Sequence, residues 1–508
     1  MPIHTPARVL AAALLLACGA RHATCEVKLP GILSSHMVLQ REKPIHVWGW
    51  SDPGEKIAVE LHGVSRTAAG NSSGSWSVFL PPEPAGGPFQ LTVTATNKIV
   101  LEDVLIGDVW FASGQSNMEM PLKGFTGAPV KNSAEEIAHA SQPQIRLIRF
   151  PRKAVDFPQR NIDASWTVCT PETAADFSAA AYFFGRELNA REHVPIGLFD
   201  ATWGGTPAEA WVSLEAISAD AGLMPVFATR ARMTQSQADE AAISAAEWRE
   251  DEAARKAGKT PRTHPWRPEP ESWAPAWLFN GMVAPATPYA IKGVIWYQGE
   301  SNSRLNFAPM YARLFPALIA DWRGQWHEGD FPFLFVQIAN FRSNDTEVWA
   351  VIREAQRRTL SVANTAMVVT TDIGDPVNVH PADKQTVGAR LALAARALAY
   401  GENVEYSGPL FRQAAADGEG IRIWFDHAGS GLVAKGGTLL GFEIAGSDGR
   451  FVPAAARVDG KTVVVSSAQV AEPKYVRYGW ANAPSINLFN SEGLPASPFT
   501  SEDAIPVR

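Results

Sequence analysis

Hydrophobic positions along the chain change their pattern twice, and each change predicts a different kind of structure. From residue 26 to 101 the apolar runs are short and mixed with polar residues, as in Ile45–Trp50 and Phe89–Thr94. Turn signals such as Asp52-Pro53-Gly54 separate these runs and leave no room for long helices. The pattern predicts a small N-terminal β-sandwich over residues 26–101.

Short continuous apolar runs replace this pattern after residue 101. Such runs are typical of strands buried on both faces of a parallel sheet. They are Val109–Ala112, Ile196–Phe199, Val294–Tyr297, Phe333–Val336 and Met367–Thr370. Segments with helical spacing of apolar residues lie between them, at 179–188, 308–322 and 384–400. Strand and helix therefore alternate, which predicts an α/β domain with a doubly wound parallel sheet over residues 102–400.

Two segments depart from this alternation. Residues 218–273 contain a charged stretch at 247–259 followed by closely spaced prolines, which predicts an inserted helical excursion. The two interpretations of this insertion are a solvated surface element and a lid over the site. After residue 400 short β-like runs return, so residues 401–508 are predicted to form a β-rich C-terminal domain.

The charge composition of the chain limits the kinds of molecule that it is expected to bind, but it does not distinguish between folds. The chain has 45 Lys+Arg against 52 Asp+Glu and a formal net charge of -7, so it lacks the broad basic surface that nucleic-acid phosphates require. Nucleic acid is therefore not an expected partner. No segment after the N-terminus has the ~20 uninterrupted apolar residues of a transmembrane helix, and the sequence leaves the oligomeric state open.

Residues 1–25 have the pattern of a secretory signal peptide. Arg8 precedes the apolar run Val9–Ala17, which is too short to cross a bilayer. Cleavage after Ala20 or Ala23 predicts a secreted or periplasmic protein. The alternative is a lipoprotein anchored through Cys18, because Leu15-Leu16-Ala17-Cys18 matches a lipoprotein box.

The cysteines allow little cross-linking. With Cys18 in the signal region, the mature chain has at most one disulfide, between Cys25 and Cys169, and a chain of this size needs none. No cluster of cysteines suggests zinc.

Polar clusters suited to acyl transfer follow the ends of the predicted strands. They are Ser113–Met118, Thr202–Thr206, Gln298–Asn302 and Asp372–Pro381. Ligands of doubly wound sheets bind at the carboxyl ends of the strands. We therefore expect these clusters to form one site.

Ser116 is the candidate nucleophile. Gly114 permits a tight turn, after which Ser116 stands at the N-terminus of the predicted helix, where unpaired N–H groups favour a developing oxyanion. Taken alone, such a serine is equally a helix N-cap. His380, in a loop before the helix predicted from residue 382, is the candidate general base that a nucleophilic serine requires.

Three carboxylates compete for the third catalytic position, and spacing does not choose among Asp372, Asp375 and Glu300. Gly205 is the candidate second oxyanion donor, because a Gly-Gly pair lets the backbone approach a ligand closely. The amide of Gln298 is a further donor. The plain alternatives are a turn at Gly205 and a hydrogen-bonded loop brace at Gln298 and Glu300. No metal or organic cofactor is expected, because this chemistry needs none.

Four sequence blocks carry a family resemblance. They are Gly107–Trp110 with Gly114–Met120, Trp203–Thr206, Trp296–Asn302 and His380–Lys384. These blocks resemble the sialate O-acetylesterase family, a branch of the SGNH hydrolases, and the likeness extends over nearly the whole mature chain. The resemblance implies a flavodoxin-like α/β core, Ser116 as nucleophile and His380 as base. It also implies an oxyanion hole made by the N–H groups of Ser116 and Gly205 and the side chain of Gln298 or Asn302.

The chain departs from the superfamily at one position. An Asp usually stands three residues before the catalytic His, but Val377 holds that place here. Related carbohydrate acetylesterases use a Glu in the block that contains Glu300, so we prefer Glu300 as the third member and Asp375 next. The Gly-x-Ser-x-Gly elbow of α/β-hydrolases is absent, since Met118 replaces the second Gly.

The expected function is hydrolysis of acetyl esters on sugars through an acetyl-Ser116 intermediate. The expected partner is an O-acetylated carbohydrate. Sialic acid and plant cell-wall polysaccharides such as xylan, xyloglucan or pectin both remain open, because the sugar-side contacts come from loops. The alternatives from other classes are an inactive glycan-binding protein and a lipid or peptide hydrolase.

Overall fold

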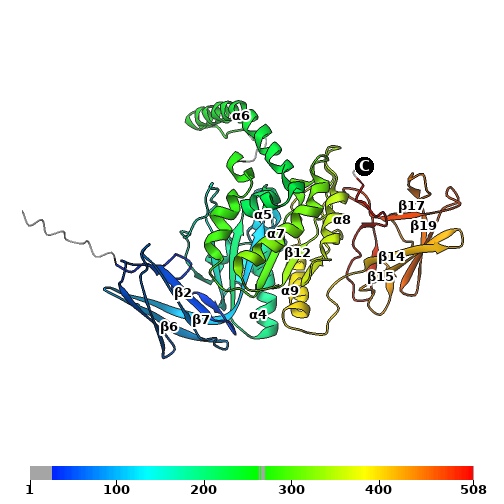
Figure 1. The fold of residues 1–508 in the computed structure, drawn as a ribbon. Helices are drawn as coiled ribbons and strands as arrows, with labels where there is room; N and C mark the ends of the chain where they lie inside the picture. The colour runs from blue at the N-terminus through cyan, green and yellow to red at the C-terminus, as the bar shows by residue number, and fades with distance from the viewer. Residues whose placement is uncertain (1–25, 263, 265–268, 507–508) are drawn as a thin grey trace, which may run out of the picture.

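The computed structural model describes residues 26–262, 264 and 269–506. A β-rich N-terminal part, a central α/β part and a β-rich C-terminal part follow one another along the chain (Figure 1). The predictions of a signal peptide, of a lipidated Cys18 and of a disulfide to Cys25 lie outside the described residues. Cys169 is buried, and burial raises the pKa of its thiol to about 12.

The N-terminal part consists of two β layers, as predicted. One layer contains β1 Val38–Gln40, β3 Lys56–Leu61, β4 Val64–Ala69, β6 Gly86–Thr94 and the first half of β7 Lys98–Gly114; the other is the antiparallel pair β2 Ile45–Trp50 and β5 Ser75–Leu80. Along β3 the buried side chains are those of Ile57, Val59 and Leu61, which is the alternation expected of a strand with one face on a core.

Strand β7 is longer than its predicted counterpart and belongs to both parts. Its first half pairs antiparallel with β6, and its second half pairs in parallel with β10 Ile196–Thr202 and β11 Gly293–Tyr297. The predicted boundary between residues 101 and 102 therefore falls inside a continuous strand. Asp103, with a positive φ of 54°, interrupts the apolar pattern there, which is why the sequence predicts two separate segments.

The central sheet has a flavodoxin-like strand order. Its order is β13 Thr365–Val368, β12 Phe333–Val336, β11, β7, β10 and β8 Gln142–Arg149, with β9 Thr167–Cys169 antiparallel at the edge. From β10 to β13 this is the 2-1-3-4-5 order of doubly wound sheets. The predicted parallel α/β core is confirmed.

Helices cover both faces of this sheet, because successive residues of each strand point to opposite sides. Trp110 and Ala112 pack in one apolar cluster with α4 Ala179–Glu192 and α9 Lys384–Leu398. Val109 and Phe111 pack in another cluster with α7 Tyr311–Trp326 and α8 Trp349–Thr359. Shorter helices on the connections are α2 Ser133–Ala138, α3 Pro171–Ala175 and α5 Leu214–Ala219.

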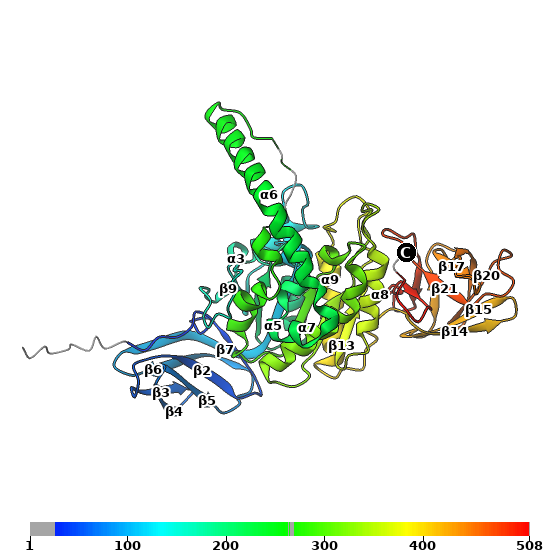
Figure 2. The same cartoon turned by 45° about the horizontal axis from the view of Figure 1, so that its top comes forward.

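The inserted segment is helical, as expected. Helix α6 Pro225–Lys256 projects from the central part, and both views show it extending away from the body (Figure 2). At the end of the insertion the chain forms a single 3-10 turn, Pro270–Trp273, and the side chain of Trp273 is buried. Within the described residues, no helix is long and apolar enough to cross a membrane.

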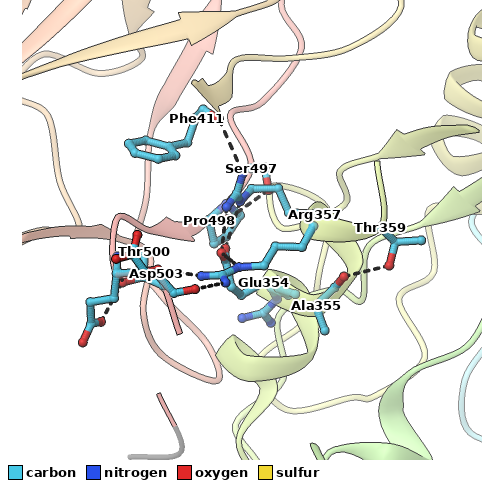
Figure 3. A network of polar contacts seen from close by, with 12 residues as sticks. Glu354, Ala355, Arg357, Thr359, Phe411, Ser497, Pro498, Thr500 and Asp503 are labelled. Carbon is cyan, nitrogen blue, oxygen red and sulfur yellow. Dashed lines mark hydrogen bonds and ion pairs between the residues drawn. The ribbon is translucent and has the colours of Figure 1, made fainter. Parts of the chain in front are cut away.

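The C-terminal part is β-rich, as predicted. Its sheets are β14 Leu410–Asp417, β15 Gly420–Asp426, β20 Thr462–Ser466 and β19 Ala455–Asp459; β18 Val452–Pro453, β17 Phe442–Ala445, β21 Tyr475–Tyr478 and β23 Phe499–Thr500; and β16 Leu432–Ala434 with β22 Leu488–Asn490. Polar contacts tie this part to α8 (Figure 3). Buried Glu354 accepts hydrogen bonds from Arg357 and Arg358, which in turn donate to the carbonyls of Phe411 and Glu502. These contacts couple the C-terminal sheets to the central domain.

Candidate active site

The carboxyl ends of three central strands lie side by side. Gly114 of β7 is in register with Thr202 of β10 and Tyr297 of β11. Only glycine fits at position 114, because its φ is +135° and a Cβ would lie 2.2 Å from the carbonyl oxygen of Tyr297. The polar residues that follow these strands therefore start from one place, the topological switch point of the sheet.

Ser116 opens α1, the helix predicted to follow the first strand of the core. The helix spans only Ser116–Glu119, and Met120 already leaves helical geometry. A single turn has only a small macrodipole, so the dipole contributes little to stabilising an oxyanion here. The Ser116 N–H nevertheless has no partner in the helix, as the first N–H groups of any helix do not.

One cavity of about 830 Å³ gathers the principal predicted residues. Ser116, Gly205, Glu300 and His380 all line it. Gln298, Asn302, Asp372 and Asp375 do not. The structure therefore brings the proposed nucleophile and base together with Glu300 and Gly205, and leaves four of the predicted residues outside the cavity lining.

The loop that carries Gly205 packs against Ser116. The Gly204 N–H donates to Glu119 Oε2 (2.8 Å), and Glu119 Oε1 also accepts from Arg152 Nε (2.9 Å). A Cβ on residue 204 would lie 3.2 Å from Ser116 Cβ, so the loop packs directly against the serine. Because Gly204 is occupied, the Gly205 N–H, which forms no hydrogen bond within the described residues, is the donor that remains for an oxyanion.

The side-chain amides of Gln298 and Asn302 are engaged in a buried network. Gln298 Nε2 donates to Asn302 Oδ1 (2.7 Å) and to the Thr206 carbonyl (3.3 Å), while Asn302 Nδ2 donates to Glu209 (2.8 Å). Both side chains are almost fully buried. In this geometry they brace the loops of the site, as the plain interpretation of the sequence had it, rather than face an oxyanion.

Gln115 is a site residue that the sequence analysis missed. Its Oε1 accepts from the N–H groups of Gly299 (3.4 Å) and Ser301 (3.1 Å), and its side chain lines the cavity. Its amide nitrogen forms no hydrogen bond in the described part of the chain and is thus a donor available to a ligand. Its position in the sequence, directly before the candidate nucleophile Ser116, was the feature from which it could have been predicted.

His380 is a neutral imidazole in this environment. Its ring packs edge-on against Phe125, with ring centroids 5.1 Å apart, and its backbone N–H donates to Asn378 Oδ1. Burial, and then the positive charge of Lys384, lower the pKa of His380 to about 4. A neutral ring is the form that accepts a proton.

The three candidate carboxylates have different surroundings. Asp372 uses both oxygens in an ion pair with Arg390 (2.7 Å each), and Asp375 Oδ1 accepts from the Val377 N–H in a local turn. Glu300 is buried in the cavity wall, with Oε1 accepting from Asn117 Nδ2 (2.6 Å) and Oε2 without a partner in the described residues. Burial raises the pKa of Glu300, and the hydrogen bond from Asn117 opposes this. Of the three, Glu300 alone combines a place in the cavity with an unused oxygen.

Aromatic and charged side chains form the outer wall of the cavity. Trp203, Trp273 and Trp349 line it, with the Arg152 guanidinium 5.7 Å from the ring centre of Trp203 and that of Arg304 5.5 Å from Trp273. Within residues 26–262, 264 and 269–506, no group of His, Cys, Asp and Glu side chains is arranged to hold a metal ion. A serine, a neutral histidine, a buried carboxylate and free N–H donors around one cavity have the chemistry of acyl transfer.

Comparison with known proteins agrees with this geometry. The model of the family described as carbohydrate esterase, sialic acid-specific acetylesterase matches residues 263–397. Rat sialate O-acetylesterase is 30% identical over 96% of each chain. This chain belongs to the sialate O-acetylesterase family. Human sialate O-acetylesterase is 31% identical, with 77% of this chain and 74% of the human protein covered.

A solved structure extends the likeness to the fold. The crystal structure of a carbohydrate acetylesterase from Xanthomonas citri is 37% identical, with a TM-score of 0.81, and the match covers 94% of this chain and 100% of that one. The predicted membership of the sialate O-acetylesterase family and the predicted enzyme class, a carboxylic ester hydrolase, are confirmed.

Proposed function

We propose that this carbohydrate O-acetylesterase hydrolyses acetyl esters of sugars with Ser116 as nucleophile and His380 as general base. The observation that carries the proposal is that Ser116, His380, Glu300 and Gly205 line one cavity at the switch point of the sheet. The N-terminal signal pattern supports export, so we propose that the enzyme acts in the periplasm or outside the cell.

The reaction takes place in two halves. Ser116 Oγ attacks the acetyl carbonyl carbon while His380 takes its proton, and the resulting oxyanion accepts hydrogen bonds from the N–H groups of Ser116 and Gly205. The C–O bond to the sugar then breaks, and His380 returns the proton to the sugar oxygen. Water next attacks acetyl-Ser116, His380 takes the proton from the water, and acetate leaves as Ser116 regains its hydrogen.

We propose Glu300 as the carboxylate that supports His380. Glu300→Gln keeps the size of the side chain but removes the charge that stabilises an imidazolium, so we expect kcat to fall by about 10²- to 10⁴-fold. Asp375→Asn is the matched control, because Asp375 lies outside the cavity, and its rate should stay within about threefold of wild type. Initial rates of acetate release measure both. Full activity of the Glu300 variant, or equal losses in the two, would reject this assignment.

The tryptophans that line the cavity are suited to stacking against a sugar ring of the substrate. Trp273 Nε1 donates to the Gly205 carbonyl (2.8 Å), so Trp273 also steadies the oxyanion loop. Trp273→Phe retains a ring but loses this bond, and we expect kcat to fall by up to about tenfold with little change in KM. Trp273→Ala removes both, so KM for the sugar ester should rise as well. A KM for Trp273→Ala that stays at the wild-type value would show that no sugar stacks there.

Membership of the family implies an acetylated carbohydrate but does not specify which sugar carries the acetyl group. We favour O-acetylated sialic acid, because Arg304 lies at the cavity wall and forms no ion pair within the described residues, as a sialate carboxylate would require. Plant cell-wall polysaccharide is the second candidate, supported by the three tryptophans that line the cavity. Acetate release from acetylated sialic acid, xylan, xyloglucan and pectin distinguishes the two. Binding to these glycans without acetate release would instead indicate an inactive glycan-binding protein.

A further inference from the structure

The two residues beside Ser116 both contact the loop that carries Glu300. Gln115 Oε1 accepts from the N–H groups on either side of Glu300, those of Gly299 and Ser301. Asn117 Nδ2 donates to Glu300 Oε1 (2.6 Å) and to the carbonyl of Val379 (3.0 Å), the residue before His380. Asn117 therefore joins the segments of the nucleophile, the carboxylate and the base.

A buried lysine completes this network. Lys384 is the first residue of α9, its side chain is fully buried, and Nζ donates to Asn117 Oδ1 (2.6 Å). Its Nζ also lies 5.3 Å from the ring centre of Tyr297. A buried ammonium group is costly unless a negative charge compensates it, and the carboxylate that stabilises its charge is Glu300. The reaction steps described above do not use this lysine.

We propose that Lys384 is a positioning residue that acts through Asn117 as the buried countercharge of Glu300 and so keeps this carboxylate ionised in the cavity that His380 also lines. The inference rests on the proposed roles of Ser116, His380 and Glu300. Asn117 transmits the contact, because it is a donor to Glu300 and an acceptor from Lys384 at the same time.

The charges around Glu300 define the expected pH dependence. Lys384 from α9 and Arg353 from α8 lower its pKa against the larger effect of burial, and the neutral phenols of Tyr297 and Tyr311 pack nearby. Lys384 also lowers the pKa of His380. Removal of the ammonium group therefore raises the pKa values of both the carboxylate and the base. Both changes move the acid limb of the reaction in the same direction, toward higher pH.

The test measures the reactivity of Ser116 without a sugar. A fluorophosphonate reacts covalently with a base-activated serine, and its second-order rate constant is recorded from acid to alkaline pH for wild type and Lys384→Met. We expect the midpoint of the acid limb to move up by about one pH unit in the variant. At alkaline pH the two rates should converge, because burial lowers the pKa of Lys384 to about 7 and the wild-type lysine has then lost its own proton.

Two further variants make the result decisive. Lys131→Met is the matched control, because Lys131 lies at the same end of α9, paired with Asp383 at 3.8 Å, but does not contact Asn117. Its profile should overlay that of wild type. Asn117→Ala interrupts the network without changing a charge and should displace the limb in the same direction, which keeps the test valid if Lys384→Met does not fold.

The outcomes separate this inference from the proposed function. An unshifted midpoint in both network variants, or a rate lowered equally at every pH, would overturn the role of Lys384. A wild-type enzyme that does not react with the fluorophosphonate would refute Ser116 as nucleophile and this inference with it. A displaced midpoint in an enzyme that releases no acetate from any sugar would support the role of Lys384 and reject the proposed substrate.

Discussion

Ser116→Ala is expected to lower acetate release by at least about 10⁴-fold. The hydroxyl oxygen is the atom that forms the acyl bond, and the alanine methyl group has no electron pair to replace it. Ser116 is only partly buried, and its hydroxyl forms no hydrogen bond within the described residues, so its loss leaves no unpaired polar group. The melting temperature should therefore stay close to that of wild type.

Ser113→Ala is the matched control and should show the opposite result. Ser113 lies three residues earlier on β7, is fully buried, and its Oγ donates to the carbonyl of Ala201 (2.7 Å). Its loss should cost about 1 kcal/mol of unfolding free energy, measured by denaturant titration, while activity stays within a few-fold of wild type. Activity retained in Ser116→Ala and lost in Ser113→Ala would place the nucleophile elsewhere.

His380→Ala is expected to have the second-largest effect, a loss of kcat of about 10⁴-fold. Without the imidazole no group takes the proton of Ser116 as it attacks. Free imidazole should restore part of the rate, because the alanine variant leaves space in a cavity that already measures about 830 Å³. His139→Ala, which changes an exposed histidine outside the cavity, should be as active as wild type. If His380→Ala loses little kcat and free imidazole does not raise its rate, His380 is not the base.

The pH dependence of wild type gives a separate test of His380. Burial disfavours the charged ring, so its pKa of about 4 lies below the ordinary value of 6.5. The imidazole therefore stays neutral, and able to accept a proton, well below pH 6. We expect kcat/KM to remain high through mildly acid conditions and to fall only as the pH approaches about 4. An acid limb centred near 6.5 would mean that the base is a solvated histidine.

Local sequence was sufficient for features that depend on one segment. The continuous apolar runs at Val109, Ile196 and Val294 predict buried parallel strands because a strand covered on both faces has no polar side. The sequence blocks around Ser116 and His380 predict the family. Gly114 predicts a tight turn before the nucleophile, and the structure shows that a side chain there would collide with Tyr297.

Features that depend on two segments were predicted less well. The sequence did not predict that β7 runs without a break through residues 98–114, because Asp103 interrupts the run of apolar residues. In the structure Asp103 has a left-handed backbone conformation, and the strand continues on both sides of it. The sequence predicted a helix at Ser116 but not its end, because its single turn stops where the chain packs against α4 through the bond from the Ala179 N–H to the Met120 carbonyl. The predicted domain boundary fell inside β7 because of Asp103.

By itself, then, the sequence predicted the alternation of strands and helices in the core, the family, and Ser116 and His380 as candidate nucleophile and base, because each depends on periodicity or on contiguous motifs. Only the tertiary structure decided which polar side chains face the cavity. Gln298 and Asn302 stand in the right block, but their amides are used by Thr206 and Glu209, whereas Gln115 keeps a free donor at the site. Glu300 was separated from Asp372 and Asp375 in the same way, because hydrogen-bond partners and burial are set by residues far apart in the chain.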